Sequence, residues 1–401
     1  MPLTPRLALL VWCAGSARVL ALQVFTPADF FIRRQVGQLG VATETEWQYY
    51  GGARNKLDAS QPSRTVEVSG VSVRLFEGEI AGGERVLLKE YLGAAQSIGE
   101  NELIITRHLY DRNAEAAAAS NGSLRPPTEL AAMVGHMRSD RAFEARAFRD
   151  QWAVQLPNTP APEAGNLWLV FRWQGLQTVS AFPKAEQARA FWDVTGGNAL
   201  KCRKRYLRAI VAGALNAIGW MHTRGVVHRS LGASSLLLNT LDQQKASSLS
   251  VKLIDLGFAA TAAMLSEEEV KSAMRRGATS PTDILPLLAL NDLHGLAYVL
   301  LELILTSLGP SETGPRLELQ ALKRLVEDVF EDDVLGGFRE YCAEEPAYAD
   351  ALSFLDECDR GGWRLLQRLV DCHNPQGELA RTSAPELLRA DWLQEWLLVD
   401  A

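Results

Sequence analysis

The sequence predicts an α+β fold with two lobes, a small β-rich N-lobe and a larger helical C-lobe. The front half is strand-like, with glycine-separated segments at 65–68, 73–80 and 85–91 and a last apolar run at 167–172. The rear is helical by pattern, with helices expected at 200–224, 291–305, 316–330, 361–372 and 383–398. A β-rich front followed by a helix-rich rear favours segregated lobes over one alternating α/β sheet.

The composition is that of an ordinary globular protein, since 47% of the 401 residues are hydrophobic and 22% are charged. This length suits one two-lobed domain or two smaller ones. The net charge is -7 and no run of Lys or Arg occurs, which argues against a nucleic-acid partner. The five cysteines form no CxxC pair and the six histidines lack metal-ligand spacing, so we expect free thiols and no zinc site.

Residues 1–21 look like a targeting segment. Arg6 gives a positive start, and an apolar run too short to span a bilayer follows at 7–14. Beyond it, Arg33 and Arg34 lie in an acid-poor stretch, so residues 22–61 are expected to be a leader or a transit-like linker. Two localisations stay open, a plastid (chloroplast) reached through a signal and transit segment, or the secretory pathway.

Residues 111–163 are predicted to be an insertion, because Ala, Asn, Gly and Pro gather at both ends around one expected helix at 127–152. A glycosylation sequon at Asn121 lies inside it and matters only in the secretory lumen.

The apolar run 284–308 has the composition of a membrane helix. It carries Asp292, His294 and Glu302, which are costly at bilayer depth. We therefore expect a buried core helix and no transmembrane helix in the mature domain.

Two motifs in the rear half carry the chemistry. His228 and Arg229 open a loop that runs to three leucines at 236–238, and Asp255 begins an Asp-Leu-Gly sequence after an apolar run. In order and spacing the pair resembles the protein-kinase catalytic loop H-R-D-L-x-x-x-N and the D-F-G metal loop. The resemblance covers about residues 62–396 and implies one protein-kinase fold. The shorter fragments at 89–91, 169–173 and 292–303 resemble a kinase-like group of plant and algal chloroplasts.

The resemblance implies a phosphate site. Lys89 takes the position of the phosphate-binding lysine and Glu102 that of its helix carboxylate, with Glu100 as a rival. Asp255 would ligate a Mg²⁺ ion that bridges the phosphates of ATP.

The adenine and lid positions depart from the family pattern. The family usually has a small residue where this chain has Leu87, and Leu237 is the second expected nucleotide contact. The lid glycines would fall at Val68, Gly70 and Val73, so only the middle one remains. ATP and Mg²⁺ are accordingly expected to bind weakly.

The catalytic loop lacks the groups that phosphoryl transfer requires. Ser230 replaces the catalytic aspartate, and loss of a general base typically slows a reaction roughly 10²–10⁴-fold. Gly232 replaces a lysine and Ser235 replaces the metal-binding asparagine. His228 and Arg229 are retained, and in the family this arginine often pairs with a phosphorylated activation segment.

Three functions stay open. The first is a pseudokinase that regulates or scaffolds an unknown protein partner. The second is an active Ser/Thr kinase, or another ATP-dependent phosphotransferase, with a non-standard loop, which the retained Lys89 and Asp255 support. The third is a kinase-fold module that binds a lipid or another small molecule. Whether the chain is an enzyme depends on whether Ser230 can act in place of the catalytic aspartate and Ser235 in place of the metal-binding asparagine.

Overall fold

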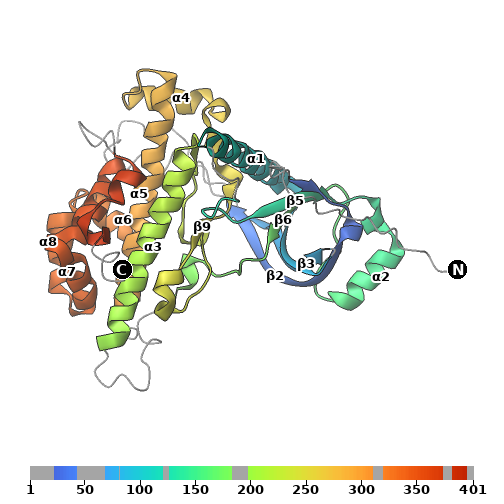
Figure 1. Ribbon diagram of the computed structural model, residues 1–401, viewed down its shortest axis with the longest axis horizontal. Helices are drawn as coiled ribbons and strands as arrows, with labels where there is room; N and C mark the ends of the chain where they lie inside the picture. The colour runs from blue at the N-terminus through green and yellow to red at the C-terminus, as the bar shows by residue number, and fades with distance from the viewer. Residues whose placement is uncertain are drawn as a thin grey trace.

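The computed structural model describes residues 22–42, 68–80, 82–120, 126–182, 197–309, 319–373 and 382–394. A β-sheet forms the N-terminal region and helices form most of the remainder, as the α+β prediction required. The helices α3, α5 and α8 gather at one end of the molecule and the sheet lies at the other (Figure 1).

The sheet has six strands in the order β1-β5-β6-β4-β3-β2. Their bounds are β1 (Gln23–Val24), β2 (Phe30–Ala42), β3 (Val68–Ile80), β4 (Glu84–Tyr91), β5 (Met133–Arg138) and β6 (Leu167–Arg172). β4 is central and is covered on both faces. Val86 and Leu88 pack into one apolar cluster, whereas Leu87 and Tyr91 pack into another on the opposite face. This alternation puts Lys89 on the same face as Leu87 and Tyr91.

Residues 22–42 belong to the sheet, which corrects the expected leader at 22–61 and the domain start at 62. β2 pairs with β3 from Phe30 opposite Ile80 to Ala42 opposite Val68. The basic residues that suggested a transit segment are cross-strand ion-pair partners, since Arg34 Nε lies 2.8 Å from Glu77 Oε2. Removal of the expected leader at 22–61 would delete the strands β1 and β2. Residues 1–21 lie outside the described residues, and their targeting role stays a prediction.

The region 111–163 is not one insertion around one helix. α1 (Gln96–Ala119) runs into it, and β5 occupies part of the stretch where a helix was expected. β5 alternates between more and less buried positions, the period of a strand, and pairs with β6 on one side and β1 on the other. α2 (Arg146–Gln155) is the remaining helix. The sequon at Asn121 lies outside the described residues.

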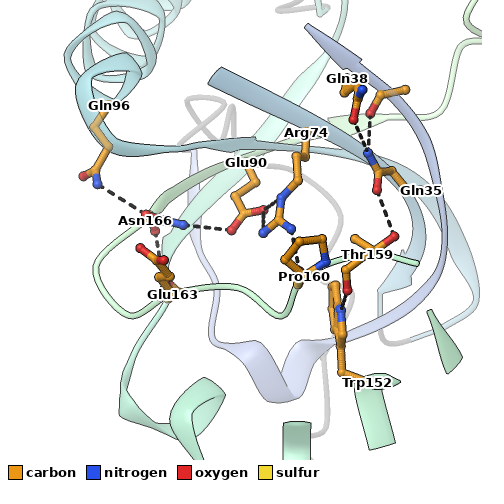
Figure 2. A network of polar contacts seen from close by, with 12 residues as sticks. Gln35, Gln38, Arg74, Glu90, Gln96, Trp152, Thr159, Pro160, Glu163 and Asn166 are labelled. Atoms are coloured by element: carbon orange, nitrogen blue, oxygen red, sulfur yellow. Dashed lines mark hydrogen bonds and ion pairs between the residues drawn. The ribbon is translucent and has the colours of Figure 1, made fainter. Parts of the chain in front are cut away.

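A buried polar network fixes the segment between α2 and β6 against the sheet (Figure 2). Arg74 of β3 and Glu90 of β4 form an ion pair at 2.6 Å, with side chains 6% and 0% exposed. Arg74 also donates to the Pro160 carbonyl at 2.5 Å, and Asn166 donates to Glu90 at 2.9 Å. The segment between α2 and β6 therefore supplies a hydrogen-bond partner to each of the two buried charged side chains, Arg74 and Glu90.

The helical part packs around α5 (Pro281–Leu308), whose residues Leu296 and Leu300 are fully buried. By length and composition α5 could cross a membrane, but 67% of its apolar window is buried inside the fold, as expected for a core helix. The other helices are α3 (Gly197–His222), α4 (Glu267–Arg275), α6 (Leu319–Arg324), α7 (Arg339–Glu344), α8 (Ala349–Val370) and α9 (Ala384–Leu387).

Two small antiparallel ladders hold the loops that carry the motifs. β7 (Val226–Val227) pairs with β10 (Ala260–Thr261), and β8 (Leu236–Leu238) pairs with β9 (Val251–Leu253). The catalytic-loop motif lies between β7 and β8, and the Asp-Leu-Gly motif between β9 and β10. The ladders thus bring together two loops that are separate in the sequence.

Candidate functional site

Lys89, Glu102 and Asp255 meet although they come from β4, α1 and the loop after β9. Lys89 Nζ lies 2.8 and 3.1 Å from the two carboxylate oxygens of Glu102 and 2.9 Å from Asp255 Oδ1. The side chains of Lys89 and Glu102 are buried, whereas that of Asp255 is 36% exposed. The arrangement is a buried cation held between two carboxylates, one of which a ligand can reach.

The charges of this cluster keep Lys89 protonated and Tyr91 neutral. Burial alone would lower the pKa of Lys89, but the negative charges of Asp255 and Glu102 hold it well above its ordinary value. The Tyr91 hydroxyl donates a hydrogen bond to Glu102, and burial together with the Glu102 charge raises the pKa of Tyr91 well above its usual range. Glu102 thus binds a permanent cation and a neutral phenol.

Glu100, the rival partner for Lys89, points elsewhere. It forms an ion pair with Arg138 of β5, in which both side chains are about half exposed. The carboxylate that reaches Lys89 is therefore that of Glu102.

A single buried carboxylate fixes the start of the catalytic loop to α5. Asp292 accepts hydrogen bonds from the backbone N–H of His228 at 2.7 Å and of Arg229 at 2.8 Å, and lies 2.9 Å from His222 Nε2. Burial alone would raise the pKa of Asp292, but the hydrogen bond and charge of His222 hold it below its ordinary value. Arg229 has a φ of 69°, a left-handed conformation that these bonds help to maintain.

The catalytic loop and the metal loop are joined by hydrogen bonds. His228 Nε2 lies 3.1 Å from the Ile254 carbonyl, and the Ile254 N–H donates to the Ser235 carbonyl at 3.0 Å. The Ser235 hydroxyl is used inside the loop, because it donates to the Ser230 carbonyl and accepts from the Gly232 N–H, both at 3.3 Å. Ser230 itself is exposed. The loop is thus held by its own hydrogen bonds and by Asp292, with the Ser235 hydroxyl used inside it.

Arg229 has a carboxylate partner in the segment after the metal loop. Its Nη2 lies 2.6 Å from Oε1 of Glu269, a residue of α4. The hydroxyl and backbone N–H of Ser266 also bind Glu269, at 2.9 and 2.7 Å. The Arg229 guanidinium is therefore paired with a carboxylate that the sequence itself supplies.

The two residues expected at the adenine lie on different parts of the fold. Leu87 is half-buried on β4, opposite Phe171 of β6, and packs into the cluster of the sheet. Leu237 is buried in β8, where it bridges to Thr178 in the chain that follows β6. The chain that runs from β6, opposite Leu87, to Thr178, opposite Leu237, therefore connects the surroundings of these two residues.

The lid assignment was wrong. Val68, Gly70 and Val73 lie within β3, where Val68 pairs with Ala42 and Val73 pairs with Leu39. They belong to a sheet ladder rather than a phosphate-binding turn. The expectation of two strands at 65–68 and 73–80 with a turn between them is wrong, because 68–80 forms one strand. The connection between β2 and β3 spans residues 43–67, outside the described residues.

Two polar residues of the site escaped the sequence reasoning. Tyr91 lies two positions after Lys89, and strand alternation alone places both side chains on one face. Asn101 precedes Glu102 and donates from one amide nitrogen to the carbonyls of Gly257 and Ala259, at 2.8 and 2.9 Å. Nothing in the sequence marks the contact of Asn101 with Gly257 and Ala259, because it joins residues far apart in the chain.

Comparison with known proteins identifies the fold. No family model matches the sequence, and no curated protein matches it. Among solved structures, this fold is similar to the crystal structure of a Stt7 homolog from Micromonas algae, soaked with ATP. The TM-score is 0.52 with 19% sequence identity, over 92% of this chain and 93% of the other. At this identity the likeness shows the fold alone, which is kinase-like.

Proposed function

We propose that this chain is a pseudokinase, a kinase-like domain that binds ATP weakly with Mg²⁺ and regulates or scaffolds a protein partner. The observation that carries the proposal is the contact of Lys89 with both Glu102 and Asp255 beside a loop that has Ser230 at the base position. The sheet and the helical part would act as two lobes, with the nucleotide bound between them.

The binding half of the proposal rests on charge. An ammonium ion held by one carboxylate gives a fixed positive point for phosphate oxygens. Asp255 is the more exposed of the two carboxylates, so Mg²⁺ could bind it in place of Lys89. The Lys89 ammonium group would then be available to bind the phosphates. The similar structure came from a crystal soaked with ATP, which agrees with a nucleotide ligand.

The regulatory half of the proposal rests on the absence of a general base and a free metal ligand at Ser230 and Ser235. Ser230 cannot accept a proton as a carboxylate does, and the Ser235 hydroxyl is committed to loop bonds. The loop nevertheless keeps its anchor on Asp292. A preserved scaffold without a base suits binding and signalling better than turnover. Entry into a plastid or the secretory pathway through residues 1–21 is a further part of this proposal.

A thermal-shift titration tests the binding half. The melting temperature of the purified protein should rise with ATP and Mg²⁺, because a ligand at 100 times its dissociation constant stabilises by about 2.7 kcal/mol. Lys89→Ala should lose the shift, whereas Lys271→Ala, which alters an exposed lysine of α4, should keep it. A shift that is equal in both variants would place the nucleotide elsewhere.

A further inference from the structure

We propose that Asn101 is a positioning residue that holds the Asp-Leu-Gly loop against α1 and so keeps Asp255 beside Lys89. The ligand that this arrangement serves, ATP with Mg²⁺, rests on the proposed function. The clamp itself is a property of the fold without any ligand.

The first support is the geometry of the Asn101 amide. Its nitrogen carries two hydrogens, and two loop carbonyls lie within reach, those of Gly257 at 2.8 Å and Ala259 at 2.9 Å. Both partners can only accept, so the nitrogen and not the oxygen faces the loop. An aspartate here would put a carboxylate against two carbonyl oxygens, and an alanine would leave them without this donor.

The second support is direct packing of the loop on the same face of α1. A Cβ atom at Gly257 would lie 2.2 Å from Ile98 Cγ2 and 3.2 Å from the Ile98 carbonyl oxygen. Only glycine allows this approach of the loop to the helix. Ile98 and Asn101 are three residues apart and therefore neighbours on one helical face. One contact is steric and the other is polar, and together they hold the loop at consecutive points.

The third support is the backbone of Asp255. Its φ of 62° and ψ of 51° are left-handed, which a residue with a side chain rarely adopts unless its surroundings impose it. The Asn101 bonds hold the residues that come directly after this turn. The ion pair with Lys89 holds the side chain from the other direction.

The helix that supplies the clamp is itself anchored to β4 from both faces of the sheet. On one face Lys89 and Tyr91 bind Glu102, the residue next to Asn101. On the other, Glu90 accepts from Asn166, whose side-chain oxygen accepts from Gln96 near the start of α1 at 3.4 Å (Figure 2). Adjacent residues of α1 therefore position the lysine and the metal loop together, and a shift of α1 would move both.

The test compares Asn101→Ala with Asn113→Ala. Asn113 is also half-buried on α1, twelve residues further along the helix, and its side-chain oxygen accepts from Arg224 at 3.2 Å. Hydrogen exchange without nucleotide is the first readout. Backbone amides 256–259 should exchange about tenfold faster in Asn101→Ala, the effect of losing roughly one net hydrogen bond, and at the wild-type rate in Asn113→Ala.

The second readout is the Mg²⁺ dependence of ATP affinity by calorimetry. Asn101→Ala should lose the gain in affinity that Mg²⁺ provides, while affinity in EDTA stays near that of wild type, since Lys89 and Glu102 remain paired. If Asn101→Ala does not fold, Asn101→Ser keeps one donor in place of two and should show the same faster exchange to a smaller extent.

Unchanged exchange at 256–259 in a folded Asn101 variant would overturn the clamp. The same holds if Asn113→Ala speeds exchange there as much. If the exchange result holds but wild type binds no ATP, the clamp stands and the proposed function fails, so the two failures are distinguishable.

Discussion

Lys89 Nζ lies 2.8 Å from Glu102 Oε2, and this contact ties the central strand of the sheet to α1. Both side chains are almost fully buried, so neither charge can turn to water if the other is removed. The pair therefore has a structural role besides any role toward nucleotide. It also gives the first prediction a well-matched control on the same helix.

Glu102→Gln should destabilise the protein far more than Glu100→Gln. Removing one partner of a buried ion pair typically costs about 3–5 kcal/mol, and because Lys89 keeps Asp255 as its second carboxylate, the loss here should lie near the lower end. An exposed pair is worth about 0–1 kcal/mol. Glu100 forms such an exposed pair with Arg138. Urea denaturation of both variants measures the difference. Equal, small losses would mean that Glu102 is not the partner of Lys89.

Asp292→Asn should loosen the catalytic loop as well as lower stability. The variant replaces one accepting oxygen with a donor, so a backbone N–H of His228 or Arg229 loses its partner. The expected loss is about 1–3 kcal/mol, the cost of leaving a buried polar group unsatisfied. Asp111→Asn, at an exposed position of α1, should lose a small fraction of that. Denaturation curves and hydrogen exchange at residues 228–230 check both statements.

The same residue predicts a dependence on pH. His222 and the backbone donors hold the folded pKa of Asp292 below its ordinary value of about 3.9. A depressed carboxyl pKa contributes stability that is present above the unfolded value and lost as pH falls through the folded value. The stability gap between wild type and Asp292→Asn should therefore shrink as pH falls below about 4, where Asp292 becomes protonated. A gap that widens as pH falls below 4 would contradict this assignment.

Glu269→Gln should free the segment that contains α4. Arg229 and Ser266 share the Glu269 carboxylate, and loss of its charge weakens both contacts. Limited proteolysis should cut between residues 262 and 276 faster in this variant than in wild type. Glu268→Gln, an exposed neighbour, is the control and should behave as wild type. Identical cleavage of all three proteins would show that the ion pair does not order the segment.

Leu87→Ala should improve ATP binding. Leu87 lies on the same face of β4 as Lys89, where the kinase resemblance places the purine. Relief of overpacking is worth about 1–3 kcal/mol, so affinity should rise roughly tenfold or more. Calorimetry with MgATP measures it. Tight binding by wild type with no gain in the variant would show that Leu87 does not face the nucleotide.

The sequence was sufficient for the kinase-like fold and for the residues that meet at Lys89, because loop motifs and strand alternation are local patterns. It misled at β2, since basic residues that pair across two strands look like a targeting segment when the partner strand is not considered. Gly70 became a lid candidate because two strands were expected at 65–68 and 73–80, whereas 68–80 forms one strand. β5 was read as part of a helix because the surrounding composition outweighed a six-residue alternation. Asn101 and Glu269 could not be found, because their partners are set by tertiary packing.

The most direct test of the central claim is a paired measurement on one preparation of wild-type protein, MgATP binding by calorimetry and transfer of the γ-phosphate to itself or a generic substrate. We predict weak, Mg²⁺-dependent binding that Asp255→Ala abolishes, with no transfer above a protein-free blank. Steady phosphorylation that disappears in Asp255→Ala would contradict the pseudokinase account and establish a kinase that works without an aspartate at position 230.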